Sequence, residues 1–280
     1  MIVVAGGTGR LGRLVVERLR GSGEEIRTMS RSDGDVRDRA AADRAVAGAR
    51  VVISAISAFG RKGVTPREVD DEGNANLITA AERQGVERFV LISVHGASPD
   101  HAMELARMKH RAERRLIASR LRWTILRPTT FIETFQEALC APLLARRKAV
   151  VLGHARNPVN FVSAHDVARV VEVAVLEQAA PNSIVELGGP ENLSLVEFVE
   201  AFAGALGLAI SIKHVPQLAL RVLSQLARPF NPMFARMAQA GVVMDTTDMT
   251  FDARELVARY PQIAWTTVVD AARRDYLGAA

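Results

Sequence analysis

Glycines near the start of the chain have the spacing of a phosphate-binding loop. In "VVAGGTGRLGRLVVERL", Gly6, Gly9 and Gly12 follow an apolar run and open an amphipathic segment, and Gly7 can replace Gly6 in a second fit to such a pattern. The first glycine permits a tight turn, the second lets the backbone approach a pyrophosphate, and the third lets a helix pack closely on a strand. The first helical turn adds unpaired N–H groups and a positive dipole end. The pattern predicts a dinucleotide-binding loop made by Gly6, Thr8, Gly9, Arg10, Leu11 and Gly12.

The residues after the second apolar run indicate which dinucleotide binds. The run "IRTM" is followed by Ser30 and Arg31, and Asp33 comes shortly after them. At this position an acidic residue bonds the ribose 2′-hydroxyl of NAD, whereas a basic residue accommodates the 2′-phosphate of NADP. The planar guanidinium of arginine suits a phosphate. Arg31 therefore favours NADP(H) as the cofactor, and Asp33 keeps NAD open as the alternative.

A lysine stands on an apolar helical face in the segment "LARMKHRAERRL". Leu105, Met108, Ala112 and Leu116 recur at spacings of three and four residues, and Lys109 lies on the same stripe. One interpretation is that the stem of the lysine packs at the edge of the core while its ammonium reaches water. The other is that the ammonium points into a functional site.

These residues belong to a chain that alternates short apolar runs with amphipathic segments. The expected strands are Ile2–Ala5, Glu25–Met29, Val51–Ala55, "RFVLIS" (88–93) and "WTILRP" (123–128). The expected helices are Leu11–Leu19, a segment that ends at Gly85, and the segment that carries Lys109. Near-continuous apolar strands that alternate with helices are typical of a parallel sheet covered on both faces. We therefore predict a Rossmann-type, doubly wound α/β fold.

The second half of the chain has a different character. A helix is expected to begin at Ser194, with Glu197 completing a capping box, and to end at Gly207. Beyond Val215 the sequence is mostly apolar helix interrupted by prolines. We predict a Rossmann domain over 1–155 and a smaller C-terminal lobe over 156–280 that binds the substrate or a partner, with a helix near 164–178 packing back on the sheet.

Composition narrows the classes of function. Of the 280 residues, 49% are hydrophobic and 24% charged, as in an ordinary soluble protein, and Cys140 is the single cysteine. That count excludes an internal disulfide, and we expect no metal site. The net charge of +5 comes from arginines interleaved with acids, and only 5% of residues are aromatic, which argues against nucleic-acid binding. The first residues do not resemble a signal peptide and no apolar stretch has the length of a membrane span, so we expect a cytoplasmic protein that does not bind membranes and acts on a small molecule.

An ordered set of motifs gives the chain a family resemblance. The segments "VVAGGTGRLG", "SRS", "GDVRD", "VVISAIS", "LITAAERQGVERFVLIS", "MKHRAERRLIASRLRWTILRP", "NFVSAHDVA" and "LGGPENLS" resemble the NmrA-like, NAD(P)H-binding group of atypical short-chain dehydrogenases/reductases, over roughly residues 1–200. The resemblance implies that Asp35 and Val36 flank the adenine. It also implies that Ser54, Ala55 and Ile56 line the ribose and diphosphate, and that Pro128 and Thr129 approach the nicotinamide.

The resemblance also implies a role for Lys109, and the chain departs from the superfamily pattern at one position. In this superfamily a lysine on this helix binds the nicotinamide ribose, and a tyrosine four residues earlier exchanges the proton. Lys109 matches the lysine, but Leu105 stands at the tyrosine position. Ser93 and His95 lie near the place where related enzymes carry a catalytic serine or threonine, and either His95 or His110 could exchange a proton near neutral pH. We therefore predict Lys109, Ser93 and His95 as catalytic residues.

Three functions are compatible with this pattern. The first is an NADPH-dependent oxidoreductase that acts on a small apolar acceptor. Quinones and conjugated carbonyls fit best, because reducing a quinone develops a phenolate whose conjugate acid has a pKa of about 10 and needs little help from an acid. The second is a non-catalytic NADP(H) sensor of the NmrA type that binds a partner protein through the apolar helices at 217–244. The third, a nucleotide-sugar epimerase or dehydratase relative, is weakened because its chemistry depends on the absent tyrosine.

Two further expectations concern the surroundings of the site. Relatives carry a helix and more of a strand where this chain has only a few residues between Ser30 and Asp35, so we expect an open adenine side. Aromatic and methionine side chains that could line an apolar pocket or belong to the core are Phe131, Phe135, Met233, Phe234 and Met237. A homodimer is one assembly compatible with the apolar C-terminal helices.

Overall fold

The computed structural model describes residues 1–146, 148–176, 182–216, 219, 222 and 230–278, and its chain divides into two compact units. Unit 1 comprises Met1–Pro128 and Val167–Leu187, and unit 2 comprises Thr129–Asp166 and Gly188–Ala280. This division differs from the expected domains 1–155 and 156–280. The first stretch of unit 1 ends at Pro128. The last strand of its sheet, and most of the helix before that strand, come from Val167–Leu187, where the chain returns to the sheet.

Unit 1 is built on one parallel sheet of six strands. The order is β2-β1-β3-β4-β5-β9, formed by β2 (Ile26–Met29), β1 (Ile2–Ala5), β3 (Val51–Ser54), β4 (Arg88–Ile92), β5 (Arg122–Pro128) and β9 (Ser183–Leu187). Five of these strands were expected, each within one residue of the observed bounds. Every residue of β1, β3 and β4 is buried, as the predicted doubly covered sheet requires. The direction of winding reverses between β1 and β3, and ligands of such folds bind outside the carboxyl ends of the strands at that point.

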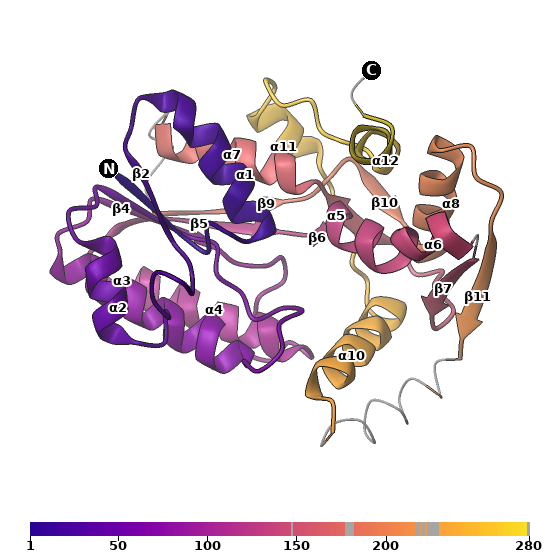
Figure 1. The fold of residues 1–280 in the computed structure, drawn as a ribbon, viewed down its shortest axis with the longest axis horizontal. Helices are drawn as coiled ribbons and strands as arrows, with labels where there is room; N and C mark the ends of the chain where they lie inside the picture. The colour runs from indigo at the N-terminus through magenta and orange to yellow at the C-terminus, as the bar shows by residue number, and fades with distance from the viewer. Residues whose placement is uncertain (147, 177–181, 217–218, 220–221, 223–229, 279–280) are drawn as a thin grey trace. The chain divides into compact units, whose positions relative to one another are not determined.

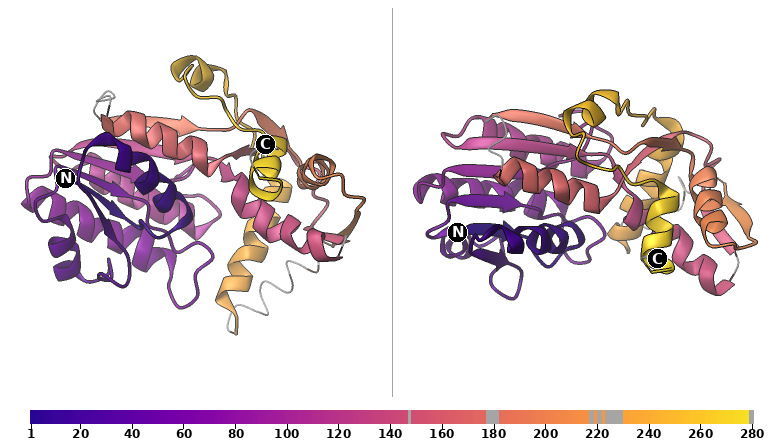
Figure 2. Two further views of the ribbon diagram at one scale, coloured as in Figure 1. Left: turned by 45° about the horizontal axis from the view of Figure 1, so that its top comes forward. Right: turned by 90° about the horizontal axis from the view of Figure 1, so that it is seen from above.

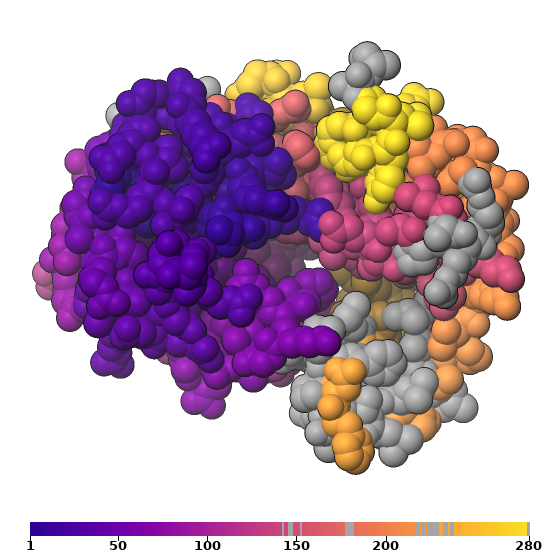
Figure 3. Space-filling view, viewed as in Figure 1, coloured from indigo at the N-terminus to yellow at the C-terminus, as the bar shows by residue number. Residues whose placement is uncertain are grey.

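Helices cover both faces of this sheet (Figure 1). On one face lie α1 (Arg10–Leu19) and α7 (Ala164–Leu176), and on the other lie α2 (Arg39–Val46), α3 (Asn74–Arg83) and α4 (Glu104–Ile117). The guanidinium of Arg88 donates to the carbonyl of Ala174 over 2.5 Å, which ties α7 to the sheet. Two further views also show α7 lying along the strands, where the sequence placed a helix near 164–178 (Figure 2). In the space-filling view, α1 to α4 and their loops hide the central strands (Figure 3).

The buried face of α4 differs from the expected stripe. Leu105 and Met108 are only half-buried, whereas Lys109 and Glu113 are buried together with Ala112. Two charged side chains of α4 therefore lie inside unit 1. The burial of a charge is costly unless the charge is paired, so both residues need partners.

Unit 2 combines two small sheets with helices. One sheet has the order β10-β8-β6 and the other pairs β11 with β7. The strands are β6 (Thr130–Phe131), β7 (Lys148–Leu152), β8 (Val159–Val162), β10 (Glu191–Leu193) and β11 (Ser211–Val215). The helices include α5 (Ile132–Phe135), α6 (Ala141–Arg146), α8 (Leu195–Ala205), α10 (Pro232–Thr246), α11 (Arg254–Arg259) and α12 (Val268–Tyr276). The capping box of Ser194 and Glu197 at the start of α8 is confirmed.

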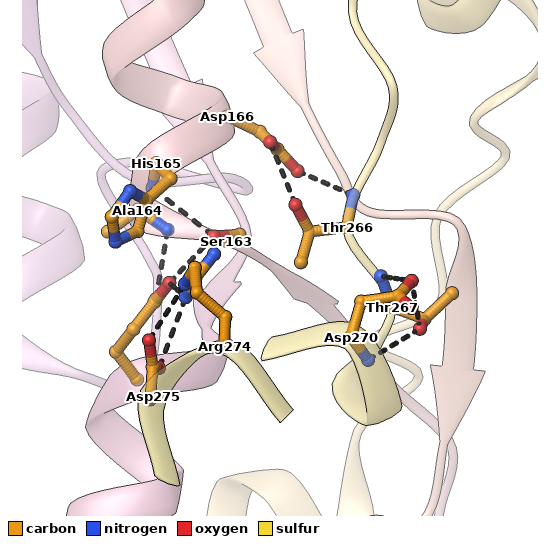
Figure 4. A network of polar contacts seen from close by, with 10 residues as sticks. Ser163, Ala164, His165, Asp166, Thr266, Thr267, Asp270, Arg274 and Asp275 are labelled. Carbon is orange, nitrogen blue, oxygen red and sulfur yellow. Dashed lines mark hydrogen bonds and ion pairs between the residues drawn. The ribbon is translucent and has the colours of Figure 1, made fainter. Parts of the chain in front are cut away.

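A polar network holds α12 within unit 2 (Figure 4). The buried carboxylate of Asp166 accepts hydrogen bonds from the amide and the hydroxyl of Thr266, at 2.7 and 3.0 Å. The guanidinium of Arg274 lies 3.2 Å from the carboxylate of Glu133, which also accepts a bond of 2.6 Å from Ser163. These contacts account for the buried carboxylates of unit 2 as structural groups. Throughout the described residues, no helix combines the length and the apolar character needed to cross a lipid bilayer.

Candidate active site

The glycine loop between β1 and α1 has the geometry that the sequence predicts. Gly6 has a φ of +81°, and a Cβ there would lie 2.8 Å from the carbonyl oxygen of Ala55. A Cβ on Gly12 would lie 2.1 Å from the carbonyl oxygen of Gly6. These two glycines are therefore required by the packing of the loop itself. A Cβ on Gly9 would have only one neighbour within 4 Å, the same Gly6 oxygen at 3.2 Å. Gly9 is the N-cap of α1, and no side chain caps the helix there.

The first turn of α1 consequently fits a phosphate group. No side chain at the N-cap accepts a hydrogen bond from its amides, and the helix dipole places partial positive charge there. The exposed Thr8 and the half-buried Arg10 flank Gly9, whereas Leu11 is buried behind the loop. This arrangement would hold the pyrophosphate of a dinucleotide at the point where the winding of the sheet reverses.

The turn after β2 presents Arg31 to solvent and engages Asp33. One carboxylate oxygen of Asp33 accepts hydrogen bonds from the hydroxyl and the amide of Ser30, at 2.6 and 2.9 Å. These bonds hold the pKa of Asp33 below its ordinary value. Asp35 is similarly engaged by Arg37, whose guanidinium donates to it over 2.6 Å and lowers its pKa. Arg31, in the same turn, is an exposed cation.

The residues expected around adenine and ribose lie in two places. Val36 is half-buried and packs on the apolar core of unit 1, with its carbonyl held by the amide of Asn76 at 2.9 Å. Ser54 ends β3 fully buried, and its hydroxyl donates to Asn74 over 2.6 Å. Ala55 lies against the glycine loop, as its contact with Gly6 shows. The structure thus brings the segment after β3 to the loop, with the Ser54 side chain turned inward.

Lys109 is buried, and its ammonium makes two hydrogen bonds and an ion pair. Its ammonium donates to the carbonyl oxygens of Ile56 at 2.8 Å and Ile92 at 2.9 Å, and it lies 3.1 Å from the carboxylate of Asp70. The Lys109 side chain is 3% exposed and that of Asp70 is fully buried. The interpretation in which the ammonium reaches water is therefore wrong. A hydrogen bond from Lys109 to the nicotinamide ribose stays a prediction.

A second polar cluster spans the carboxyl ends of β4, β5 and β9. Glu113 on α4 accepts a short hydrogen bond from the Ser93 hydroxyl and two bonds from Arg127, at 2.9 and 2.6 Å. Arg127 also donates to Glu186 over 2.9 Å, and the other oxygen of Glu186 lies 2.8 Å from Nδ1 of His95. Sequence reasoning found Ser93 and His95 but missed the three residues that connect them. For Arg127 and Glu186 the available signal was a charged residue in a largely apolar strand, whereas Glu113 lies among other charged residues of α4 and gave no such signal.

The remaining predicted residues are distributed between the units. Pro128 ends β5 in unit 1 and accepts a bond of 2.8 Å from the His95 amide. Thr129 belongs to unit 2, where its hydroxyl contacts Asn160 at 2.8 Å. Phe135 packs edge-on against two other phenylalanine rings, so it belongs to the core of unit 2. The side chains of Met233, Phe234 and Met237, and much of the segment 217–229, lie outside the described residues.

Comparison with known proteins places this site in a family. A model of an NAD(P)H-binding family matches residues 28–178, which are 151 of the 280 residues. The photosystem II assembly factor Ycf39 of Synechocystis is 24% identical and covers 99% of this chain and 90% of its own length. The NAD(P)H azoreductase of Xenophilus azovorans is 26% identical and covers 84% and 86%.

A solved structure shows the same fold. The NADPH-dependent quinone oxidoreductase of Escherichia coli in complex with NADPH aligns with a TM-score of 0.77 at 19% identity, over 98% of this chain and 99% of its own. The Rossmann-type α/β fold predicted from the sequence is thereby confirmed, as is the resemblance to atypical short-chain reductases.

Proposed function

Because the chain belongs to the NAD(P)H-binding family, we propose that it is an NADPH-dependent oxidoreductase that reduces a small apolar acceptor. One observation carries the proposal: the glycine loop after β1 and a carboxylate-bound histidine, His95, lie along the same carboxyl edge of one parallel sheet. That edge would thus offer both a place for a nicotinamide cofactor and a group able to move a proton. When bound, the cofactor would supply the hydride. NADPH consumption in the presence of a quinone tests the proposal.

The chemistry of the acceptor follows from the residue that replaces the family tyrosine. Leu105 is half-buried on α4 and offers no proton to a developing alkoxide. A quinone or a conjugated carbonyl spreads the charge that it gains, so its reduction needs a weaker acid than that of a simple ketone. The names of the related azoreductase and quinone oxidoreductase agree with acceptors of this electronic type.

Cofactor selectivity should depend on Arg31. One oxygen of Asp33 is already engaged by Ser30, and Arg31 is an exposed cation in the same turn, so we expect the protein to bind NADPH more tightly than NADH. Replacing Arg31 by Ala should weaken NADPH binding about 10- to 100-fold and leave NADH binding nearly unchanged, because a hydrogen bond to a charged group contributes about 1.5–3 kcal/mol. Titrations of both cofactors by fluorescence measure this. Arg44→Ala, at another exposed arginine of unit 1, is the control, and equal affinities of the unmutated protein for both cofactors would refute the assignment.

The phosphate site should depend on Gly9. A valine there would place methyl groups over the first turn of α1, where the pyrophosphate would lie, while the loop meets only one neighbouring oxygen. Gly9→Val should therefore fold, with a shift of a few tenths of an ångström at the Gly6 carbonyl, and lose measurable NADPH affinity. Gly21→Val is the matched control, because nothing lies within 4 Å of a Cβ at Gly21. If Gly9→Val bound NADPH like the unmutated protein, the phosphates would have to lie elsewhere.

A second candidate function is that of a non-catalytic, NADP(H)-dependent regulatory protein. Two observations favour it: the tyrosine is replaced by Leu105, and a relative that covers 99% of the chain is an assembly factor. Such a protein would bind the cofactor without consuming it. The two candidates therefore differ in whether NADPH is oxidised when an acceptor is present.

A further inference from the structure

The cluster at the ends of β4, β5 and β9 follows from the register of the sheet. Arg127 pairs with Glu186 across β5 and β9, and Ile92 pairs with Leu126, so that Ser93 follows beside Arg127. Residues at equivalent levels of neighbouring parallel strands point to the same face. His95, two residues after Ser93, returns to that face. Ser93, Arg127 and Glu186 thus form one row, and Glu113 reaches it from α4.

The charges in the row determine how the proton on His95 is held. Burial by itself would raise the pKa of the Glu186 carboxyl, but the hydrogen bonds from His95 and Arg127 outweigh burial and lower that pKa below its ordinary value. Glu186 is therefore ionised and can only accept hydrogen bonds. Because its oxygen lies 2.8 Å from Nδ1 of His95, Nδ1 must carry the hydrogen. A proton that the ring passes to an acceptor then leaves from Nε2.

The same contacts distinguish Ser93 from His95, both of which the sequence predicts as catalytic residues. The Ser93 side chain is nearly fully buried and its hydroxyl donates to the Glu113 carboxylate. Its hydrogen is therefore committed to a charge-assisted bond within unit 1. The side chain of His95, in contrast, is 36% exposed. His95 can meet a ligand, and Ser93 serves to hold Glu113.

Arg127 fixes the position of Glu186. Its guanidinium binds Glu113 through two N–H groups and Glu186 through a third, and the hydrogen bonds to Glu113, above all, raise its pKa. Because the planar guanidinium binds the two carboxylates in fixed directions, Glu186 has little rotational freedom. Glu113 on α4 thus sets the orientation of the His95 ring through Arg127 and Glu186.

We propose that Glu186 is a positioning residue that orients His95, and that Nε2 of His95 delivers the proton that the family takes from the tyrosine replaced here by Leu105. The inference rests on the proposed function. A bound dihydronicotinamide would supply the hydride and be oxidised by its loss, and His95 would supply the proton. For this transfer the ring must carry hydrogen on both nitrogens: the Nε2–H bond of the imidazolium breaks as the O–H bond of the reduced acceptor forms, the neutral ring keeps its Nδ1–H bond to Glu186, and solvent returns a proton to Nε2.

The first test observes the ring in the cofactor-free protein. Long-range ¹H–¹⁵N spectra of histidine-labelled protein report which ring nitrogen carries hydrogen, and His95→Ala identifies the signal of His95 among the six histidines. We expect a hydrogen on Nδ1 in the unmutated protein and a loss of that preference in Glu186→Gln. Glu24→Gln, which removes an ion pair with Arg50 elsewhere in unit 1, should leave the signal unchanged. An unchanged signal in Glu186→Gln would overturn the inference.

The second test measures turnover in a double-mutant cycle. Glu186→Gln should lower kcat about 10- to 100-fold with little change in KM, as is usual for the outer partner of a functional histidine. In the His95→Ala background, the same substitution should cost nothing further, because Glu186 would act only through the ring. Equal losses in both backgrounds, or unchanged turnover of Glu186→Gln, would overturn this inference alone. No NADPH oxidation by the unmutated protein with any acceptor would overturn the proposed function and the inference with it.

Discussion

Lys109→Ala is expected to lower the free energy of unfolding of unit 1 by about 3–5 kcal/mol, as when one partner of a buried ion pair is removed. The substitution would leave the fully buried carboxylate of Asp70 without its cation, and the carbonyls of Ile56 and Ile92 without their common donor. NADPH affinity should fall as well, because Ile56 belongs to the segment that lies against the glycine loop. Urea denaturation of the cofactor-free protein measures the first effect, and fluorescence titration the second.

Matched variants test whether the loss of stability comes from the ion pair of Lys109. Lys62→Ala, at an exposed lysine of the same unit, should change stability by less than about 0.5 kcal/mol. Lys109→Arg should not restore the loss, because a flat fork does not replace a compact ammonium between three oxygens. Lys109→Met combined with Asp70→Asn should recover part of the stability, since no charge is then left unpaired. Normal stability of Lys109→Ala would show that the ion pair with Asp70 contributes little.

His95→Ala is expected to lower turnover by a factor of about 10²–10⁴, the range for loss of a general acid. Binding of NADPH should hardly change, because the ring contacts Glu186 and is not part of the glycine loop. Added imidazole should restore part of the activity by supplying the missing acid. His154→Ala, at an exposed histidine of unit 2, is the control.

Comparing His95→Ala with Ser93→Ala distinguishes the roles of the two residues. Ser93→Ala should act mainly by loosening Glu113, with a smaller loss that imidazole does not rescue. If His95→Ala retained full activity while Ser93→Ala lost it, the serine would be the proton donor. That result would contradict the conclusion that the Ser93 hydroxyl is held by its hydrogen bond to Glu113.

The local elements of unit 1 could be predicted because each depends on residues close in sequence. The turn at Gly6, the close approach at Gly12 and the buried runs of β1, β3 and β4 follow from residue type and period alone. Helix α2 was not predicted: it is short, rich in alanine, and begins at Asp38, which caps Ala40. Neither alanine nor a single cap produces a strong apolar period.

Contacts between distant segments could not be predicted in the same way. The stripe placed Lys109 on the apolar face of its helix but left open whether its ammonium reaches water, and its partner Asp70 lies 39 residues earlier in the irregular helical segment Arg67–Gly73. The row of Ser93, Arg127 and Glu186 exists only once β4, β5 and β9 are known to be neighbours in register. The boundary of unit 1 at Pro128 likewise depends on the return of the chain to the sheet at β9.

The most direct test of the central claim is spectrophotometric measurement of NADPH oxidation by the purified protein against a panel of quinones and conjugated carbonyls. We expect saturable oxidation with at least one acceptor of these classes. Activity should be absent in Gly9→Val and strongly reduced in His95→Ala, whereas Gly21→Val and His154→Ala should behave like the unmutated protein. Tight binding of NADPH without oxidation by any member of the panel would contradict the claim of catalysis and favour the regulatory function.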